Sequence, residues 1–105
     1  MEEVPLDYFV DKPNIEKYSN PKIVQKKGKL YGLNVVFSPR KNKKYRIVNP
    51  NTNKFVDFGS FDPPMEDYTK HKDKERLKRF KQRNARWYNS PKYSASWLSA
   101  FLLWN

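Results

Sequence analysis

The chain has 105 residues, with 22 lysines and arginines against 11 aspartates and glutamates, so its formal net charge is +11. This length allows one domain, or one domain with a tail, and a hydrophobic content of 37% permits only a modest core. The absence of cysteine excludes disulfides and thiolate zinc sites and fits a reducing cytosolic or nuclear setting. Neither the acidic start nor the short apolar run at residues 97–104 has the pattern of a signal peptide or a membrane span.

Residues 1–29 are predicted to form an extended arm that precedes the domain. Pro5, Pro13 and Pro21 recur every eight residues and favour extended backbone. The aromatic side chains between these prolines would anchor the arm to a protein surface: Tyr8, Phe9 and Tyr18. The alternative is a disordered tail, acidic at first and basic afterwards.

Residues 30–60 are predicted to form a small antiparallel hairpin or meander. Stretches of strand composition at 33–37, 44–48 and 55–58 are separated by turn-forming clusters. Alternation along the middle strand places Tyr45 and Ile47 on one face. A sheet this small needs a helix over one face to be stable.

Two helices are predicted in the remaining chain, after a single helical turn at 66–70. The first runs from 73 to 88, with Asp73 as N-cap and an apolar arc that includes Leu77 and Phe80. Five basic residues are expected on the opposite side of this helix: Arg76, Lys78, Arg79, Arg83 and Arg86. The second helix runs from 94 to 104 and carries an aromatic stripe made of Trp97, Phe101 and Trp104.

The basic helix is the strongest functional signal. Residues 70–86 hold nine lysines and arginines against two acids, a local charge of +7. Because exposed helix faces usually mix both signs, this excess indicates a polyanionic partner, most simply nucleic acid. A second patch would supply phosphate contacts without base specificity: Lys26, Lys27, Lys29, Arg40, Lys41, Lys43 and Lys44. The alternative is a solvated face that keeps a small protein soluble.

The aromatic stripe of the C-terminal helix leaves two interpretations open. Trp97, Phe101 and Trp104 either form an interface, for a protein partner or a membrane surface, or pack into the core. Catalysis has little support, because His71 is the only histidine and it lies in a charged run without a partner group. We therefore expect no enzymatic activity, no small-molecule substrate, no metal and no cofactor.

Three stretches in residues 44–105 resemble small basic proteins of unknown function from nucleocytoplasmic large DNA viruses. These are the hairpin at 44–59, the Tyr-Thr-Lys-His-Lys-Asp motif at 68–73 with its basic helix, and the closing Trp97 and Leu102-Leu103-Trp104. The sequence of residues 83–87 departs from that pattern, and residues 1–43 have no counterpart in it. The resemblance implies a viral, non-enzymatic protein carried in the virion, present in host cytoplasm or nucleus during assembly.

Together these patterns predict an α+β fold, with a 1–29 arm and a 30–105 domain in which a hairpin or meander packs on the basic helix and the aromatic helix. The expected function is that of a minor capsid or capsid-interior protein that contacts shell proteins and the packaged genome, DNA more than RNA, without sequence specificity. A free nucleic-acid-condensing protein is the first alternative, and a peripheral membrane protein is the second.

Overall fold

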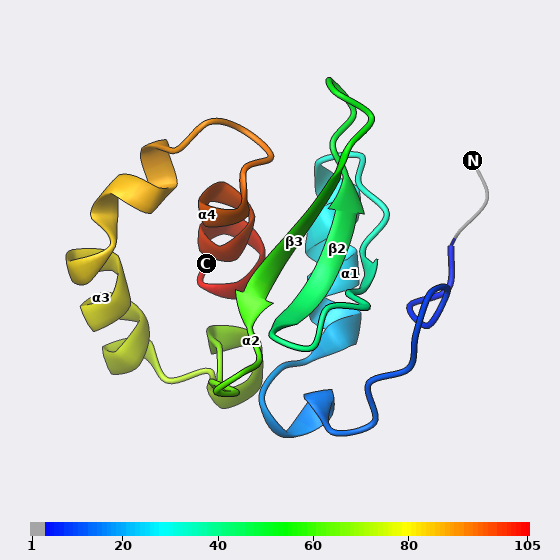
Figure 1. The fold of residues 1–105 in the computed structure, drawn as a ribbon. Helices are drawn as coiled ribbons and strands as arrows, with labels where there is room; N and C mark the ends of the chain where they lie inside the picture. Colours follow the sequence, from blue (N-terminus) through cyan, green and yellow to red (C-terminus); the bar gives the residue numbers. More distant parts are fainter. Residues whose placement is uncertain (1–3) are drawn as a thin grey trace.

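The computed structural model describes residues 4–105 and shows an α+β fold (Figure 1), as predicted. Within these described residues, a three-stranded antiparallel sheet in the order β1-β2-β3 is combined with four short α-helices. The elements in chain order are η1 (Ile15–Lys17), α1 (Pro21–Leu30), β1 (Val36–Phe37), β2 (Lys43–Val48), β3 (Phe55–Ser60), α2 (Tyr68–His71), α3 (Lys74–Arg83), η2 (Ala85–Asn89), α4 (Ala95–Leu98) and η3 (Ser99–Leu103).

The sheet has the facing that strand alternation predicts. Tyr45 of β2 pairs with Phe37 of β1 and Phe58 of β3, and the three rings lie together on the inner face. Tyr45, Ile47 and Phe58 are fully buried, whereas Val48 is half exposed. Large rings in register across the strands therefore supply much of the core of this small domain.

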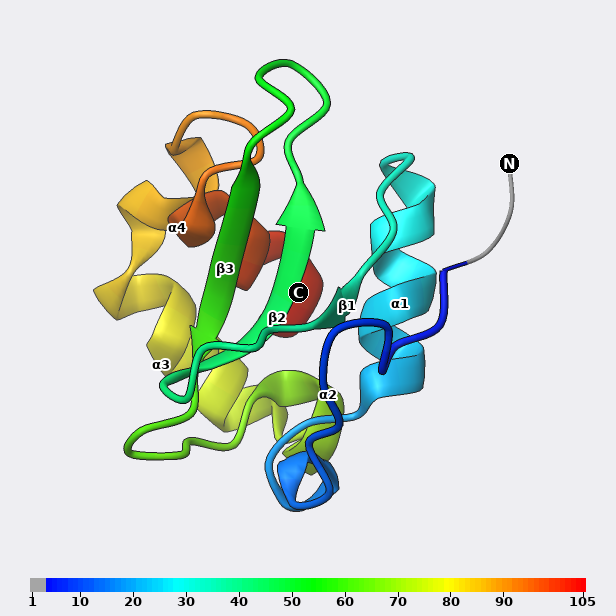
Figure 2. The same ribbon diagram turned by 45° about the vertical axis from the view of Figure 1, so that its right-hand side comes forward.

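The core lies between the inner face of the sheet, α1 and the C-terminal segment formed by α4 and η3. Figure 2 shows α1 beside β1 and the C-terminal segment behind β2 and β3. Leu98, Leu102 and Leu103 of this segment are buried against the sheet residues, and Val24 of α1 joins the same cluster. The prediction of a C-terminal helix is confirmed, with Ser94 as its N-cap and one turn of π-helix at its end.

Helix α1 replaces part of the predicted extended arm, so that prediction is wrong for residues 21–29. The Asn20 side chain caps the helix by accepting from the Ile23 amide, and Pro21 occupies the first position, where its missing N–H costs nothing. Gly28 lets α1 approach the sheet side closely, because a Cβ there would lie 2.5 Å from Val35 Cγ2. The segment before α1 reaches the sheet edge, where the Phe37 amide donates to Leu6 O at 2.8 Å.

The predicted basic helix is present but ends earlier than expected. Asp73 caps it by accepting from the Glu75 and Arg76 amides, as predicted, and the preceding residue, Lys72, has a left-handed φ of 53° that separates α3 from α2. The helix stops at Arg83 because the Asn84 amide side chain bonds to Phe80 O and its backbone leaves the helical region. Residues 85–89 continue as a 3₁₀ segment.

Candidate nucleic-acid interface

Helix α3 is attached to the rest of the molecule mainly through one aromatic side chain. Phe80 is buried and stacks on Trp104, with ring centres 4.2 Å apart and planes 2° apart. It also makes a T-shaped contact with Trp87 of η2 at 5.4 Å. Figure 1 shows α3 beyond the C-terminal segment, on the side of the molecule away from α1.

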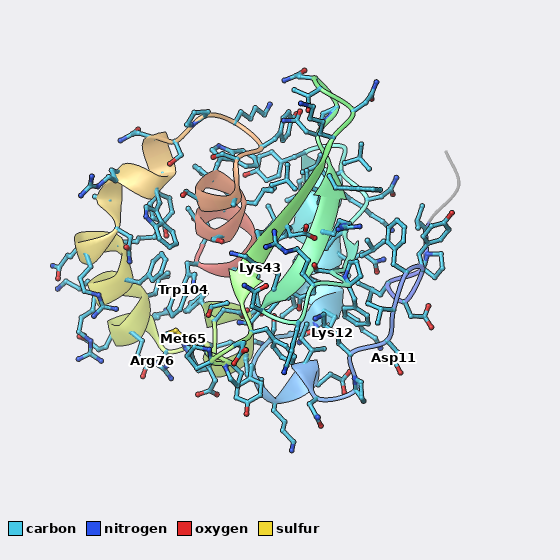
Figure 3. All side chains as sticks on the ribbon, in the orientation of Figure 1. Asp11, Lys12, Lys43, Met65, Arg76 and Trp104 are labelled. Atoms are coloured by element: carbon cyan, nitrogen blue, oxygen red, sulfur yellow. The ribbon has the colours of Figure 1, made fainter. Side chains whose placement is uncertain are left out.

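A cavity of about 650 Å³ lies between α3 and the body. In Figure 3, Arg76, Met65 and Trp104 lie between α3 and the strands, and Lys43 lies on the strand side. Charged groups and aromatic rings share the lining: Lys43, Glu66, Arg76, Arg79, Arg83, Phe80, Trp87 and Trp104. Such a combination suits an anionic ligand that also presents an apolar surface.

The basic residues of α3 are divided between two sides of the helix by type. All three arginines, Arg76, Arg79 and Arg83, line the cavity. All three lysines lie around a shallow hollow on another side, with Tyr68, Leu77 and Gln82: Lys74, Lys78 and Lys81. The division follows from spacing, because residues three or four apart share a helix face. Arginine suits the inner side, since its planar guanidinium binds phosphate in a bidentate manner and stacks on rings.

This arrangement corrects the prediction that five basic residues point away from the apolar side of the helix. Arg76, Arg79 and Arg83 share the inner side with Phe80, whereas Leu77, predicted in the apolar arc, lines the other hollow. Lys78 and Arg86 are exposed outside the cavity. The apolar arc was misplaced because only one of its α3 members, Phe80, is fully engaged with the body.

Few carboxylates neutralise the arginines. Arg76 Nη1 lies 3.4 Å from Glu66 Oε2, and both side chains are 40% exposed. Within residues 4–105, Arg79 and Arg83 make no ion pair, and neither does Lys43 across the cavity. The cavity therefore carries an uncompensated positive charge that attracts an anion.

The second predicted patch is split by the fold. Lys26 and Lys29 lie exposed on α1, and Arg40 and Lys41 lie exposed in the β1–β2 loop. Lys27 is half-buried and donates to Asn105 O, and burial lowers its pKa. These residues do not line the cavity, whereas half-buried Lys43 and buried Lys44 of the same patch do.

Lys44 is not a ligand-binding residue, contrary to the prediction. It is 2% exposed and its Nζ lies 3.0 Å from Asp67 Oδ2, which is itself buried. Burial lowers the pKa of Lys44, and the Asp67 charge opposes this shift. Asp67 also accepts from the Thr69 amide, and Thr69 contacts the Ser19 hydroxyl at 3.2 Å. The lysine therefore helps to fasten α2 to β2.

The predicted protein-interface residues also fall into two groups. Trp97 is 7% exposed and lies in the core, so its assignment to an interface is wrong. Phe101 is half-buried against Trp97, and Trp104 is held by Phe80. Tyr18 is half-buried beside Phe61.

Tyr8 and Phe9, by contrast, belong to an exposed aromatic patch. Phe9 meets Phe55 at 5.5 Å, and the Arg46 guanidinium lies 4.2 Å from the Phe55 ring centre. Arg46 is fixed by Asp57, with Nε 2.8 Å from Oδ1. Tyr8, Phe9 and Phe55 keep 63%, 44% and 53% of their surface exposed. The patch is therefore an exposed, partly apolar surface.

His71 lies beside the cavity and provides a pH-dependent contribution to stability. Its Nδ1 accepts from the Asp73 amide at 3.0 Å, and its buried Nε2 has no hydrogen-bond partner within residues 4–105. Burial, reinforced by the Arg76 charge, lowers the pKa of His71 below its usual 6.5. The unfolded chain therefore binds the proton more readily than the folded chain.

The free energy of unfolding should accordingly fall as the pH is lowered through about 6.5 towards the folded-state pKa. Urea denaturation at closely spaced pH values measures this slope. His71→Gln should flatten it in this pH range, because glutamine does not titrate there. An equal slope in the variant would show that another group is responsible.

The described residues contain no cluster of three or more histidine, aspartate or glutamate side chains arranged to hold a metal ion. No helix in residues 4–105 is both long and apolar enough to cross a membrane.

Comparison with known proteins adds a partial match. Residues 33–84 match the model of DUF5754, a family of unknown function. No curated protein and no solved structure matches the chain. The DUF5754 match runs from β1 through α3, so it includes Lys43 and the arginine row but not Trp87 or Trp104. It begins before the stretch that the sequence resemblance covers and ends before the terminal Trp-Leu-Leu-Trp motif.

Proposed function

We propose that this protein is a non-enzymatic nucleic-acid-binding protein that contacts phosphates through the inner side of α3. The observation that carries the proposal is the arginine row Arg76, Arg79 and Arg83, which lines a cavity whose only described acidic side chain is Glu66. A phosphate placed there would meet guanidinium groups that one helix carries on the same side. The net charge of +11 adds a long-range attraction to any polyanion.

The contacts of this surface favour binding without sequence specificity. Arginines that bind phosphate position a protein on the backbone and carry no sequence information. Exposed basic side chains of the β1–β2 loop and of α1 extend the positive field around the molecule, among them Arg40, Lys41 and Lys26. DNA or RNA of any sequence would therefore bind, with an affinity that falls steeply as salt is raised.

Charge reversal on the inner side of α3 tests this function. The Arg79→Glu/Arg83→Glu variant should lose more than tenfold in affinity for a labelled oligonucleotide, because two phosphate contacts become repulsive. The slope of log affinity against log salt should fall by about two for duplex DNA. Fluorescence anisotropy between 50 and 200 mM salt, a range over which phosphate contacts dominate the change in affinity, measures both quantities.

The Lys78→Glu/Lys81→Glu variant is the matched control, because it makes the same charge change on the same helix, outside the cavity. Its affinity should fall much less than that of the arginine variant. Equal losses in the two variants would show that only net charge matters and would overturn the assignment to the cavity. Circular dichroism of both variants checks that α3 still forms.

The setting we propose is the virion of a large DNA virus, where the protein would be a minor capsid or capsid-interior component. The sequence resemblance supports this, and the exposed patch of Tyr8, Phe9 and Phe55 offers a surface for a shell protein. A shell-bound protein should stay with genome-free particles at high salt, whereas a free condensing protein should be released with the genome. The membrane alternative is weaker, because Trp104 is engaged with Phe80.

A further inference from the structure

The cavity has features that a phosphate-binding surface alone does not need. Contacts to a phosphate backbone need only exposed cations, with neither a concave surface nor an aromatic ring beside them. The arginine side instead encloses about 650 Å³ and places rings beside the charges. Ligand pockets of this volume hold small organic molecules, a class that includes a single nucleotide.

We propose that the cavity binds one unpaired nucleotide, with its phosphate on the arginine row and its base against Trp87. This inference rests on the proposed function and specifies the unit of nucleic acid that the site takes. The ligand chemistry, an anionic phosphate joined to a planar base, is shared by a free nucleotide and by an unpaired residue within a strand.

Trp87 is the ring best placed to receive a base. It lines the cavity, is half-buried, and within residues 4–105 has one ring contact, the T-shaped one with Phe80. Trp104 also lines the cavity, but it is stacked on Phe80 and meets His71 at 5.3 Å. Stacking of bases on aromatic side chains is a common mode of single-strand binding, and it tolerates any sequence.

The charged groups line the same cavity as this ring. Arg83 and Arg79 precede Trp87 by four and eight residues and line the same cavity, and neither has a carboxylate partner within residues 4–105. Arg76 is oriented by Glu66, and Lys43 approaches from β2. A nucleotide could therefore place its phosphate against the arginines of α3 while its base packs on the Trp87 ring.

A paired base cannot use this site in the same way. Within a duplex, bases are stacked on each other and expose only their edges in the grooves. A base must be unstacked before it can meet an aromatic ring face to face. The cavity should therefore favour single strands over duplexes, beyond the phosphate contacts that both share.

The experiment compares a fluorescein-labelled dT12 strand with a 12-base-pair duplex at one fixed salt concentration. The wild-type chain should bind dT12 more tightly, and Trp87→Ala should weaken dT12 binding by about tenfold while leaving duplex binding unchanged. Trp87→Phe should retain most of the affinity, because a stacking ring remains. Tyr8→Ala, which removes an exposed aromatic ring outside the cavity, is the matched control and should change neither affinity.

Competition identifies the source of the nucleotide. Displacement of dT12 by millimolar dTMP would assign free nucleotides as ligands too, and failure of dTMP to compete would confine the site to nucleotides within a strand. Displacement by inorganic phosphate as effective as that by dTMP would show that the base is not bound and would overturn the inference.

The inference also fails if dT12 and the duplex bind equally and Trp87→Ala affects neither. In that case salt-dependent binding that responds to Arg79→Glu/Arg83→Glu would leave the proposed function standing. If neither nucleic acid binds, the proposed function fails together with the inference.

Discussion

Replacing Asp67 with alanine should lower the free energy of unfolding by about 3–5 kcal/mol. The substitution leaves Lys44, which is 2% exposed, without its carboxylate partner at 3.0 Å. A buried charge that loses its partner retains the cost of desolvation and loses the attraction that offset it. Because the free energy of unfolding of a native protein is about 5–15 kcal/mol, this loss would be a large fraction of the total stability. Urea denaturation at pH 7 measures it.

Three controls separate the charge effect from other consequences. Glu66→Ala breaks the half-exposed ion pair with Arg76 and should cost no more than about 1 kcal/mol. Asp67→Asn keeps an oxygen for the Thr69 amide, so it isolates the loss of charge from the loss of the α2 cap. Lys44→Met added to Asp67→Ala removes the stranded cation and should restore part of the stability. A fully tolerated Asp67→Ala would contradict the account of this pair.

Replacing Phe80 with alanine should lower the free energy of unfolding by about 3 kcal/mol and loosen α3 more than the sheet. The ring is buried and stacks on Trp104, and it is the main apolar contact between α3 and the body. Without it, α3 has little to hold it, and a short helix is marginal in water when unpacked. Hydrogen exchange measured by mass spectrometry should therefore speed up most at residues 74–83.

Leu77→Ala is the matched control on the same helix, because Leu77 is half-buried and faces the lysine hollow. It should cost less stability than Phe80→Ala and should leave the exchange of residues 85–89 unchanged. Uniform acceleration of exchange across sheet and helix in Phe80→Ala would indicate that α3 and the sheet open as one unit, contrary to the expectation.

Parts of the fold that depend on local chemistry were predicted from the sequence. The alternation at Tyr45 and Ile47 gave the facing of β2, and Asp73 and Ser94 marked the starts of two helices. Helix α1 was missed because its lysines and proline obscure a short apolar side around Val24. That side becomes stabilising only when it packs on the core, which a local pattern cannot reveal.

The candidate site was predicted in composition but not in geometry. The basic character of α3 was evident, yet the sequence could not show that Arg79 and Arg83 face the body while Lys78 and Lys81 do not. The difference depends on Phe80 docking on Trp104, a contact between residues 24 positions apart. The spacing of the arginines at three and four residues was the available signal. Lys44 gave no comparable signal, since its partner Asp67 comes from a distant segment.

The left-handed residue Lys72 separates two helices, α2 and α3, that are attached to the body in different ways. Helix α2 is fixed by the buried Asp67 pair and by the bond from the Asn20 amide to the Thr69 hydroxyl, whereas α3 beyond Lys72 is held by the contacts of Phe80 and by the half-exposed pair of Arg76 with Glu66. Helix α2 is thus attached to the body more firmly than α3. A rotation of α3 about Lys72 that widens the gap in front of the arginines would also separate Phe80 from Trp104, so the width of the cavity and the packing of α3 must change together.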